Sequence, residues 1–244
     1  MTNDFRSSFS VLRMNPNQKS YIIWSLIRNT NVIVQQISLI FLTLALYKTI
    51  LENLIDVRVL MTIGGLLFVV ISPSKVLSSI LLLNFLAGIS PILKTLTKTV
   101  STDSIYFMAA MLYIINLLLK SYSVRDSNLL KDGFSMNAGY CASVLLASRL
   151  ENIEQVFTLL LLSVCLLCYI PYFTNTIRNP ILNKIMTTTL LCATLTSWIY
   201  LSEEMAWVII GIVVCISGIS PVIFLYVQKY KTVMAGPWDE PKIT

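Results

Sequence analysis

An uncharged run of 23 residues from Met205 to Val227, MAWVIIGIVVCISGISPVIFLYV, restricts the fold of this chain more than any other feature. A helix needs about 20 apolar residues to cross the hydrocarbon core of a bilayer, where every backbone amide must find its partner inside the protein. Residues 32–51 form a second run of this kind. Because 56% of the chain is hydrophobic and only 12% is charged, the pattern predicts an all-α integral membrane protein.

Apolar runs recur along the chain and predict a single bundle of about eight transmembrane helices over residues 32–227. Residues 1–31 are predicted to form a cytoplasmic segment whose Tyr21 and Trp24 lie at the membrane interface. Residues 228–244 are predicted to form a cytoplasmic tail. The predicted spans lie near residues 32–51, 57–71, 76–93, 104–119, 133–150, 153–173, 185–201 and 205–227.

The distribution of Lys and Arg predicts the orientation of this bundle. With eight spans, both termini lie on one side of the membrane, and that side carries 13 of the 18 basic residues. Cytoplasmic loops keep the excess of Lys and Arg, so both termini are predicted to be cytoplasmic. The net charge of +6 then reflects topology rather than nucleic-acid binding. The five basic residues of the other side are Lys48, Arg58, Lys94, Lys98 and Arg149.

Several classes of catalytic and metal site are missing from the sequence. The chain has no histidine, which removes the commonest general base and the commonest metal ligand. Its five cysteines all fall inside apolar spans and are interpreted as small buried hydrophobic residues. No P-loop is present, and no polar segment approaches the roughly 100 residues of an ordinary nucleotide-binding domain. We therefore expect no metal, no cofactor and no catalytic residues of the chain's own.

Two repeated features concern helix packing. Small residues at every fourth position let helix backbones approach closely in lipid, and they predict packing inside the bundle, with a subunit interface as the alternative. The tetrapeptide GISP occurs at 88–91 and again at 218–221 and predicts kinks, because proline leaves a carbonyl without its donor. The small residues lie in the fifth predicted span and are Ser135, Gly139, Ser143 and Ala147.

Three segments of the chain resemble a known family. SPILKTLTKTVSTDSIY at 90–106, SMNAGYCASVLLASRL at 135–150 and GPWDEPKI at 236–243 resemble, in the same order, the signature segments of the PIG-C family, which are membrane subunits of the phosphatidylinositol N-acetylglucosaminyltransferase complex. VIVQQISLIFL at 32–42 is similar to the first span of that family. The family's tyrosine-proline-aspartate-asparagine segment before this span is missing, and the connection between the second and third spans is only SPSK.

The resemblance implies a role in the first step of glycosylphosphatidylinositol (GPI) anchor synthesis. In that step N-acetylglucosamine passes from UDP-GlcNAc to phosphatidylinositol at the cytoplasmic face of the endoplasmic reticulum, and the nucleotide-sugar fold belongs to another subunit. We therefore expect a non-catalytic, multi-pass subunit that scaffolds the complex and helps to present the lipid acceptor. The implied partners are the other subunits, including the catalytic glycosyltransferase, with phosphatidylinositol and membrane lipids.

The segment at 90–106 carries the predicted lipid site. Lys94 and Lys98 stand beside the hydroxyls of Thr95 and Thr99, between the third and fourth spans. They are predicted either to form part of a structural elbow or to bind a phosphate, from phosphatidylinositol or from a partner-bound lipid, as point charges. The residues assigned to lipid or partner binding are Lys94, Thr95, Lys98, Thr99, Asp103, Asn137 and Arg149.

The tail is a second candidate contact with partners. GPWDEPKI follows the basic residues Lys229 and Lys231. Trp238 is amphipathic, and Asp239 and Glu240 can pair with basic groups, so the segment predicts docking of a cytoplasmic partner domain. A solvated tail is the alternative.

Two other functions fit the sequence. A membrane-embedded lipid transferase would use Asp103 or the pair Glu203 and Glu204 as its base. A lipid transporter or scramblase would line a path with polar residues, although such amides more often bond neighbouring helices. The polar candidates for that path are Gln35, Gln36, Asn84, Asn116 and Asn137.

The predicted topology can be tested with a grafted glycosylation acceptor. An acceptor placed after Thr244 should stay unmodified, because 13 of the 18 basic residues share the side of the termini. The measurement is a shift in electrophoretic mobility that is reversed by a glycosidase. Modification of the acceptor would contradict the eight-span model.

The elbow can be tested by replacing Lys94 and Lys98 together with glutamine. If the lysines bind the lipid phosphate, the complex should assemble normally but use its acceptor lipid less well. The charge count places the elbow on the lumenal side, whereas the implied reaction lies on the cytoplasmic side. Unchanged acceptor kinetics in an intact complex would leave only the structural elbow.

Overall fold

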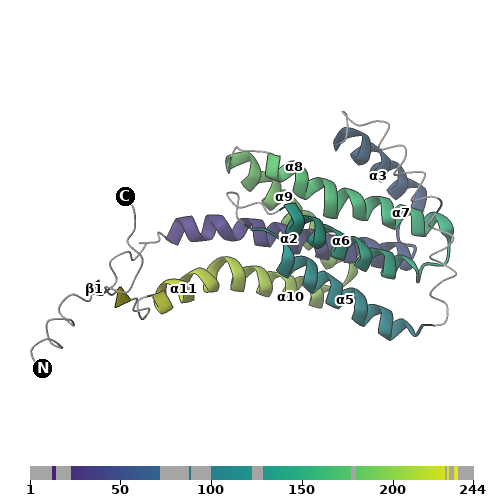
Figure 1. Cartoon of the computed structure of the whole chain (residues 1–244). Coiled ribbons are helices and arrows are strands. Elements are labelled where there is room, and N and C mark those ends of the chain that lie inside the picture. The colour runs from purple at the N-terminus through teal and green to yellow at the C-terminus, as the bar shows by residue number, and fades with distance from the viewer. Residues whose placement is uncertain are drawn as a thin grey trace, which may run out of the picture. The chain divides into compact units, whose positions relative to one another are not determined.

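The described part of the chain is almost entirely helical (Figure 1). The computed structural model describes residues 13–14, 23–71, 88, 100–122, 129–176, 180–228, 230 and 234–235. The helices within these residues are α2 (Ile23–Leu51), α3 (Val57–Ile71), α5 (Thr102–Leu119), α6 (Leu129–Ala147), α7 (Ile153–Val164), α8 (Ile170–Thr176), α9 (Pro180–Leu201), α10 (Glu203–Val214) and α11 (Ser220–Gln228), with the π-helical turns η1 (Cys165–Tyr169) and η2 (Cys215–Ile219).

Two of the helices, α5 and α7, begin where the sequence supplies capping groups. Ser101 precedes α5, and its Oγ accepts the backbone N–H of Ser104 at 3.4 Å. The side chain of Gln155 turns back at the start of α7 and accepts the backbone N–H of Asn152 at 3.1 Å. Such contacts satisfy amide groups that the first turn of a helix leaves without a partner. These contacts therefore fix where α5 and α7 begin.

The prediction of a helical fold is confirmed for the described residues, and four helices are long and apolar enough to cross a membrane. They are Thr30–Leu51, Thr102–Leu119, Ile153–Thr174 and Glu203–Gln228, and they correspond to four of the eight predicted spans.

The other four predicted spans are not among these candidates, so the number of eight stays a prediction. The span at 57–71 coincides with α3, in which Val57–Phe68 is a shorter apolar helix. The spans at 133–150 and 185–201 fall on α6 and α9, which are helical but not among those four. The span at 76–93 lies outside the described residues, apart from Gly88.

Contacts within the chain divide it into two compact units. Residues 31–212 form one unit, and residues 1–30 with 213–244 form the other. Within the second unit, β1 (Arg13–Met14) pairs with β2 (Met234–Ala235) as two antiparallel strands of two residues each, an element that the sequence did not predict. This pairing joins the segment before the predicted bundle to the segment after it.

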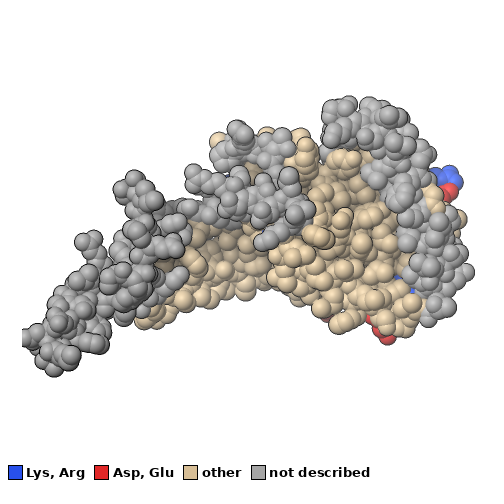
Figure 2. Space-filling view, in the orientation of Figure 1, with Lys and Arg blue, Asp and Glu red and all other residues tan. Residues whose placement is uncertain are grey.

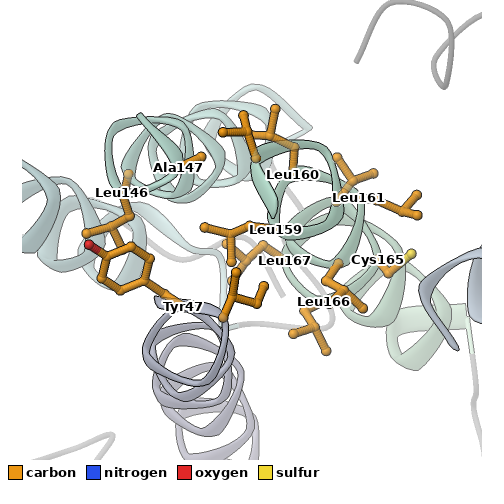
Figure 3. Close-up of a cluster of buried hydrophobic side chains, with 14 of the residues drawn as sticks. Tyr47, Leu146, Ala147, Leu159, Leu160, Leu161, Cys165, Leu166 and Leu167 are labelled. Atoms are coloured by element: carbon orange, nitrogen blue, oxygen red, sulfur yellow. The ribbon is translucent and has the colours of Figure 1, made fainter. Parts of the chain in front are cut away.

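The core of the unit formed by residues 31–212 lies between α2, α6 and α7, with α3 and α5 packed against it. Figure 3 shows Leu159 and Leu167 between the helix that carries Leu146 and Ala147 and the helix that carries Tyr47. All five side chains are buried. Since lipid tails are as apolar as leucine, dispersion contacts of this kind, rather than removal from water, hold the helices together.

The helices of this unit run in two opposite directions: α2 and α6 finish at the end that contains Tyr47, whereas α3, α5 and α7 begin there. Polar contacts at that end show the arrangement. The end of α2 meets the start of α5, where Tyr47 and Tyr106 bring their hydroxyls to 3.1 Å. The end of α6 meets the segment before α5, because Arg149 donates to the carbonyl oxygen of Val100. The start of α7 meets the turn after α2, where Gln155 Nε2 donates to Asn53 Oδ1 at 2.8 Å.

Among the described residues, most charged groups at this end are acidic. In Figure 2 the visible described surface is uncharged except for a few charged side chains at one end of the helices. A long uncharged surface suits contact with hydrocarbon, and charges belong at its edges. The described residues of the end that contains Tyr47 include the acidic Glu52, Asp56, Asp103, Glu151, Glu154, Glu203 and Glu204 and the basic Lys48, Arg58 and Arg149.

Two π-helical turns lie just before prolines. In η1 the amide of Ile170 donates to the carbonyl of Cys165, five residues back, and Pro171 follows. In η2 the amide of Ser220 donates to the carbonyl of Cys215, and Pro221 follows. Proline has no backbone N–H to donate, and the wider turn before it accommodates the missing helical hydrogen bond. The second GISP sequence, 218–221, therefore spans the junction of η2 and α11.

Candidate functional site

Buried polar side chains join α2, α5 and α6. Asn116 of α5 and Gln36 of α2 are each 1% exposed. Gln36 Nε2 donates to Asn116 Oδ1 at 2.7 Å. Asn116 Nδ2 donates to the carbonyl oxygen of Ser135 at 2.6 Å and to its Oγ at 3.2 Å, while Ser135 Oγ donates to the carbonyl oxygen of Asn116 at 2.7 Å. We call Gln36, Asn116, Ser135 and Lys120 the amide cluster.

Lys120 is the charged member of the amide cluster. It follows the last residue of α5 with an extended backbone, and its ammonium donates to Gln36 Oε1. The next residue, Ser121, donates its backbone N–H to Asp132 Oδ1 at 3.0 Å, which ties the turn to α6. Burial lowers the pKa of the Lys120 ammonium to about 8, and the charge of Asp132 acts in the opposite direction.

The predicted stripe of small residues on α6 lies against α5. Ser135 belongs to the amide cluster, and a Cβ added at Gly139 would lie 2.8 Å from Asn116 Nδ2. Ser143 Oγ and the Tyr113 hydroxyl are 3.1 Å apart. Ala147 is fully buried in the core. Small side chains at these positions let α6 approach α5 closely enough for these hydrogen bonds.

The residues assigned to lipid or partner binding do not form one site in the part of the chain that the structure describes. Asp103 is exposed in the first turn of α5, at the end where Arg149 reaches Val100. Asn137 is exposed on α6, while its neighbours Ser135 and Gly139 are buried. Other predicted residues lie outside the described residues, namely Lys94, Thr95, Lys98, Thr99, Trp238, Asp239 and Glu240.

Two of the five polar residues considered for a transport path form a contact between helices. Gln36 and Asn116 bond to one another, and Asn137 lies on the exposed face of α6. Gln35 is buried on α2, and Asn84 lies outside the described residues. The carboxylates considered for a transferase base, Glu203 and Glu204, are exposed in the first turn of α10.

Comparison with known proteins gives the family. A family model described as phosphatidylinositol N-acetylglucosaminyltransferase, GPI2, matches residues 4–239. The chain belongs to the GPI2 family. The resemblance to the PIG-C family seen in the sequence is thereby confirmed.

Curated relatives of this GPI2-family chain come from several organisms. A Dictyostelium discoideum protein, provisionally named as the C-subunit of phosphatidylinositol N-acetylglucosaminyltransferase, is 28% identical over 95% of this chain and 73% of its own length. The Schizosaccharomyces pombe protein named phosphatidylinositol N-acetylglucosaminyltransferase GPI2 subunit is 29% identical over 93% of this chain and 78% of its own length. The human protein named as the C-subunit is 25% identical over 95% and 85%. No solved structure matches the chain.

Sequence reasoning missed the amide cluster as a unit. It considered Gln36 and Asn116 as scattered polar residues, placed Ser135 in the packing stripe and counted Lys120 only as a topology charge. One available signal was the spacing of Asn116 and Lys120, because residues four apart share a helix face. A polar face at the end of an apolar helix indicates contact with polar groups of neighbouring helices.

The contact between Gly139 and Asn116 can be tested with two alanine substitutions in α6. Gly139→Ala places a methyl group 2.8 Å from Asn116 Nδ2, whereas nothing lies within 4 Å of a Cβ at Gly133. Displacing Asn116 from Ser135 should cost about 1–3 kcal/mol. The melting temperature in detergent should therefore fall for Gly139→Ala and stay equal or rise for Gly133→Ala, since alanine favours helix. Equal melting temperatures of the two variants would contradict the contact.

Proposed function

We propose that the chain is a membrane subunit of the phosphatidylinositol N-acetylglucosaminyltransferase complex, which carries out the first step of GPI-anchor biosynthesis. Within that complex it scaffolds the other subunits and helps to present the lipid acceptor, while another subunit supplies the catalytic residues. The match of residues 4–239 to the family model carries this proposal. Relatives named as subunits of the same transferase support it.

The chemistry of the described helices fits a scaffold. The side-chain amide of Asn116 donates two hydrogen bonds to Ser135, and its Oδ1 accepts a hydrogen bond from Gln36. Amides that are bonded in this way fix helices relative to one another and have little capacity left for a substrate. The chain also has no histidine that could serve as a general base.

We further propose that the chain crosses the membrane of the endoplasmic reticulum eight times, with both termini cytoplasmic. The opposite directions of α2 and α6 on the one hand and α3, α5 and α7 on the other support an up-and-down bundle in which the predicted span at 76–93 connects α3 to α5. The acidic excess at the end that contains Tyr47 supports a lumenal position for that end, since Lys and Arg concentrate on the cytoplasmic side. The amide cluster then lies toward the cytoplasmic side.

The proposed partner contacts are the tail and the elbow. Trp238, Asp239 and Glu240 are proposed to dock a cytoplasmic domain of a partner subunit. Lys94, Thr95, Lys98 and Thr99 are proposed to contact lipid or a lumenal part of a partner, together with Asp103, Asn137 and Arg149. The basic residues Lys229 and Lys231 before the tail segment support its position at the cytoplasmic membrane surface.

Co-purification tests the proposed function. A tagged full-length chain extracted in mild detergent should bring with it a subunit that has a soluble glycosyltransferase domain, as identified by mass spectrometry. That complex should transfer N-acetylglucosamine to phosphatidylinositol, and the chain purified alone should not. Activity of the chain alone would instead support the membrane-embedded transferase.

The same co-purification also tests whether the tail docks a partner subunit. Truncation after Lys231 should lower the recovery of the glycosyltransferase subunit without changing the amount of the chain itself. Truncation after Lys242, which keeps the segment with Trp238, Asp239 and Glu240, is the matched control. Equal recovery with both truncations would dismiss docking through the tail.

A further inference from the structure

Lys120 is a partly buried cation whose counter-charge does not lie within ion-pair distance among the described residues. Its one described acceptor is the uncharged Oε1 of Gln36. The ion pair found between described residues joins Lys48 to Glu52 at 3.8 Å, and Asp132 does not lie within ion-pair distance of Lys120. The carboxylate of Asp132 is held by the backbone N–H of Ser121. A buried ammonium is costly unless an anion compensates it.

The position of Lys120 indicates what kind of anion could reach it. It is the first residue after the candidate span Thr102–Leu119, so its ammonium lies near the level where hydrocarbon gives way to lipid head groups. A lysine at the end of a helix can also neutralise the helix dipole by bonding the last carbonyls. Here the ammonium bonds Gln36 on another helix instead, which turns it toward α2.

We propose that Lys120 binds the phosphate of an anionic phospholipid in the leaflet at the amide-cluster end of the bundle. An ammonium has three N–H donors, and Gln36 takes one of them. The remaining donors suit the unesterified oxygens of a phosphodiester, to which lysine binds as a point charge. Gln36, fixed by Asn116, positions the ammonium at the edge of the bundle.

The inference rests on the proposed function only in the choice of phosphatidylinositol as the first lipid to test. An anionic phosphodiester is common to phosphatidylinositol, the acceptor of the proposed reaction, and to phosphatidylserine, a bulk lipid. If Lys120 holds the acceptor, phosphatidylinositol should be retained in preference. If it holds a structural lipid, both should be retained equally, and in either case retention depends on Lys120.

The test uses the complex purified through the tagged full-length chain and placed in nanodiscs of phosphatidylcholine with a minor fraction of either anionic lipid. After transfer to detergent, native mass spectrometry counts the anionic lipid retained by each complex. Lys120→Gln should lower the apparent affinity for the anionic lipid about tenfold, as expected for a lost charge-assisted hydrogen bond. Lys120→Arg should keep most of it, because the charge remains.

Controls separate lipid binding from folding and from a protein counter-ion. Lys184→Gln removes an exposed lysine of α9 and should leave retention unchanged. Asp132→Asn, and Asp126→Asn in the segment outside the described residues, should not lower retention if the counter-charge comes from lipid. Retention by a folded Lys120→Gln variant equal to that of the unaltered chain, with an unchanged melting temperature, would overturn the proposal. Loss of the glycosyltransferase from the preparation would count against the proposed function alone.

Discussion

The hydrogen bonds of Asn116 fix the arrangement of α2, α5 and α6, and the polar features around them depend on this side chain. In a medium without water, an amide that loses its partners costs more free energy than a single hydrogen bond gains. Sliding α5 along α6 would break the two bonds from Asn116 Nδ2 and the bond from Ser135 Oγ. The close approach at Gly139 and the inward position of Lys120 both follow from this register.

The helical membrane class follows from the sequence because apolar runs of about 20 residues have few alternatives. Half of the predicted spans correspond to helices that satisfy the same criteria in the structure. The shorter or more polar helices were predicted from local apolar runs, and α6 and α9 carry enough polar residues to blur that signal. Their place beside other helices depends on tertiary contacts that hydropathy does not contain.

The amide cluster shows a further limit of reading the sequence. The stripe of small residues on α6 predicted close packing, but the pattern does not identify which helix packs against it. Gln36 and Asn116 are 80 positions apart, and nothing in either local sequence indicates their pairing. Lys120 carries two signals at once, because a basic residue after a span is expected from topology alone. Only the structure, in which the ammonium of Lys120 points toward Gln36, distinguishes a binding role from a charge that merely sets the topology.

The π-helical turn η1 also determines which way the end of its helix faces. One extra residue in a turn changes the rotational phase of everything after it by about 100°, the angle between successive helical residues. In α7 and η1 the buried face is formed mainly by leucines, but in α8 Pro171 and Thr174 are buried while Tyr172 and Phe173 are exposed. The turn thus presents two aromatic rings outward at the end of a span, where such rings anchor a helix at a fixed depth in the membrane.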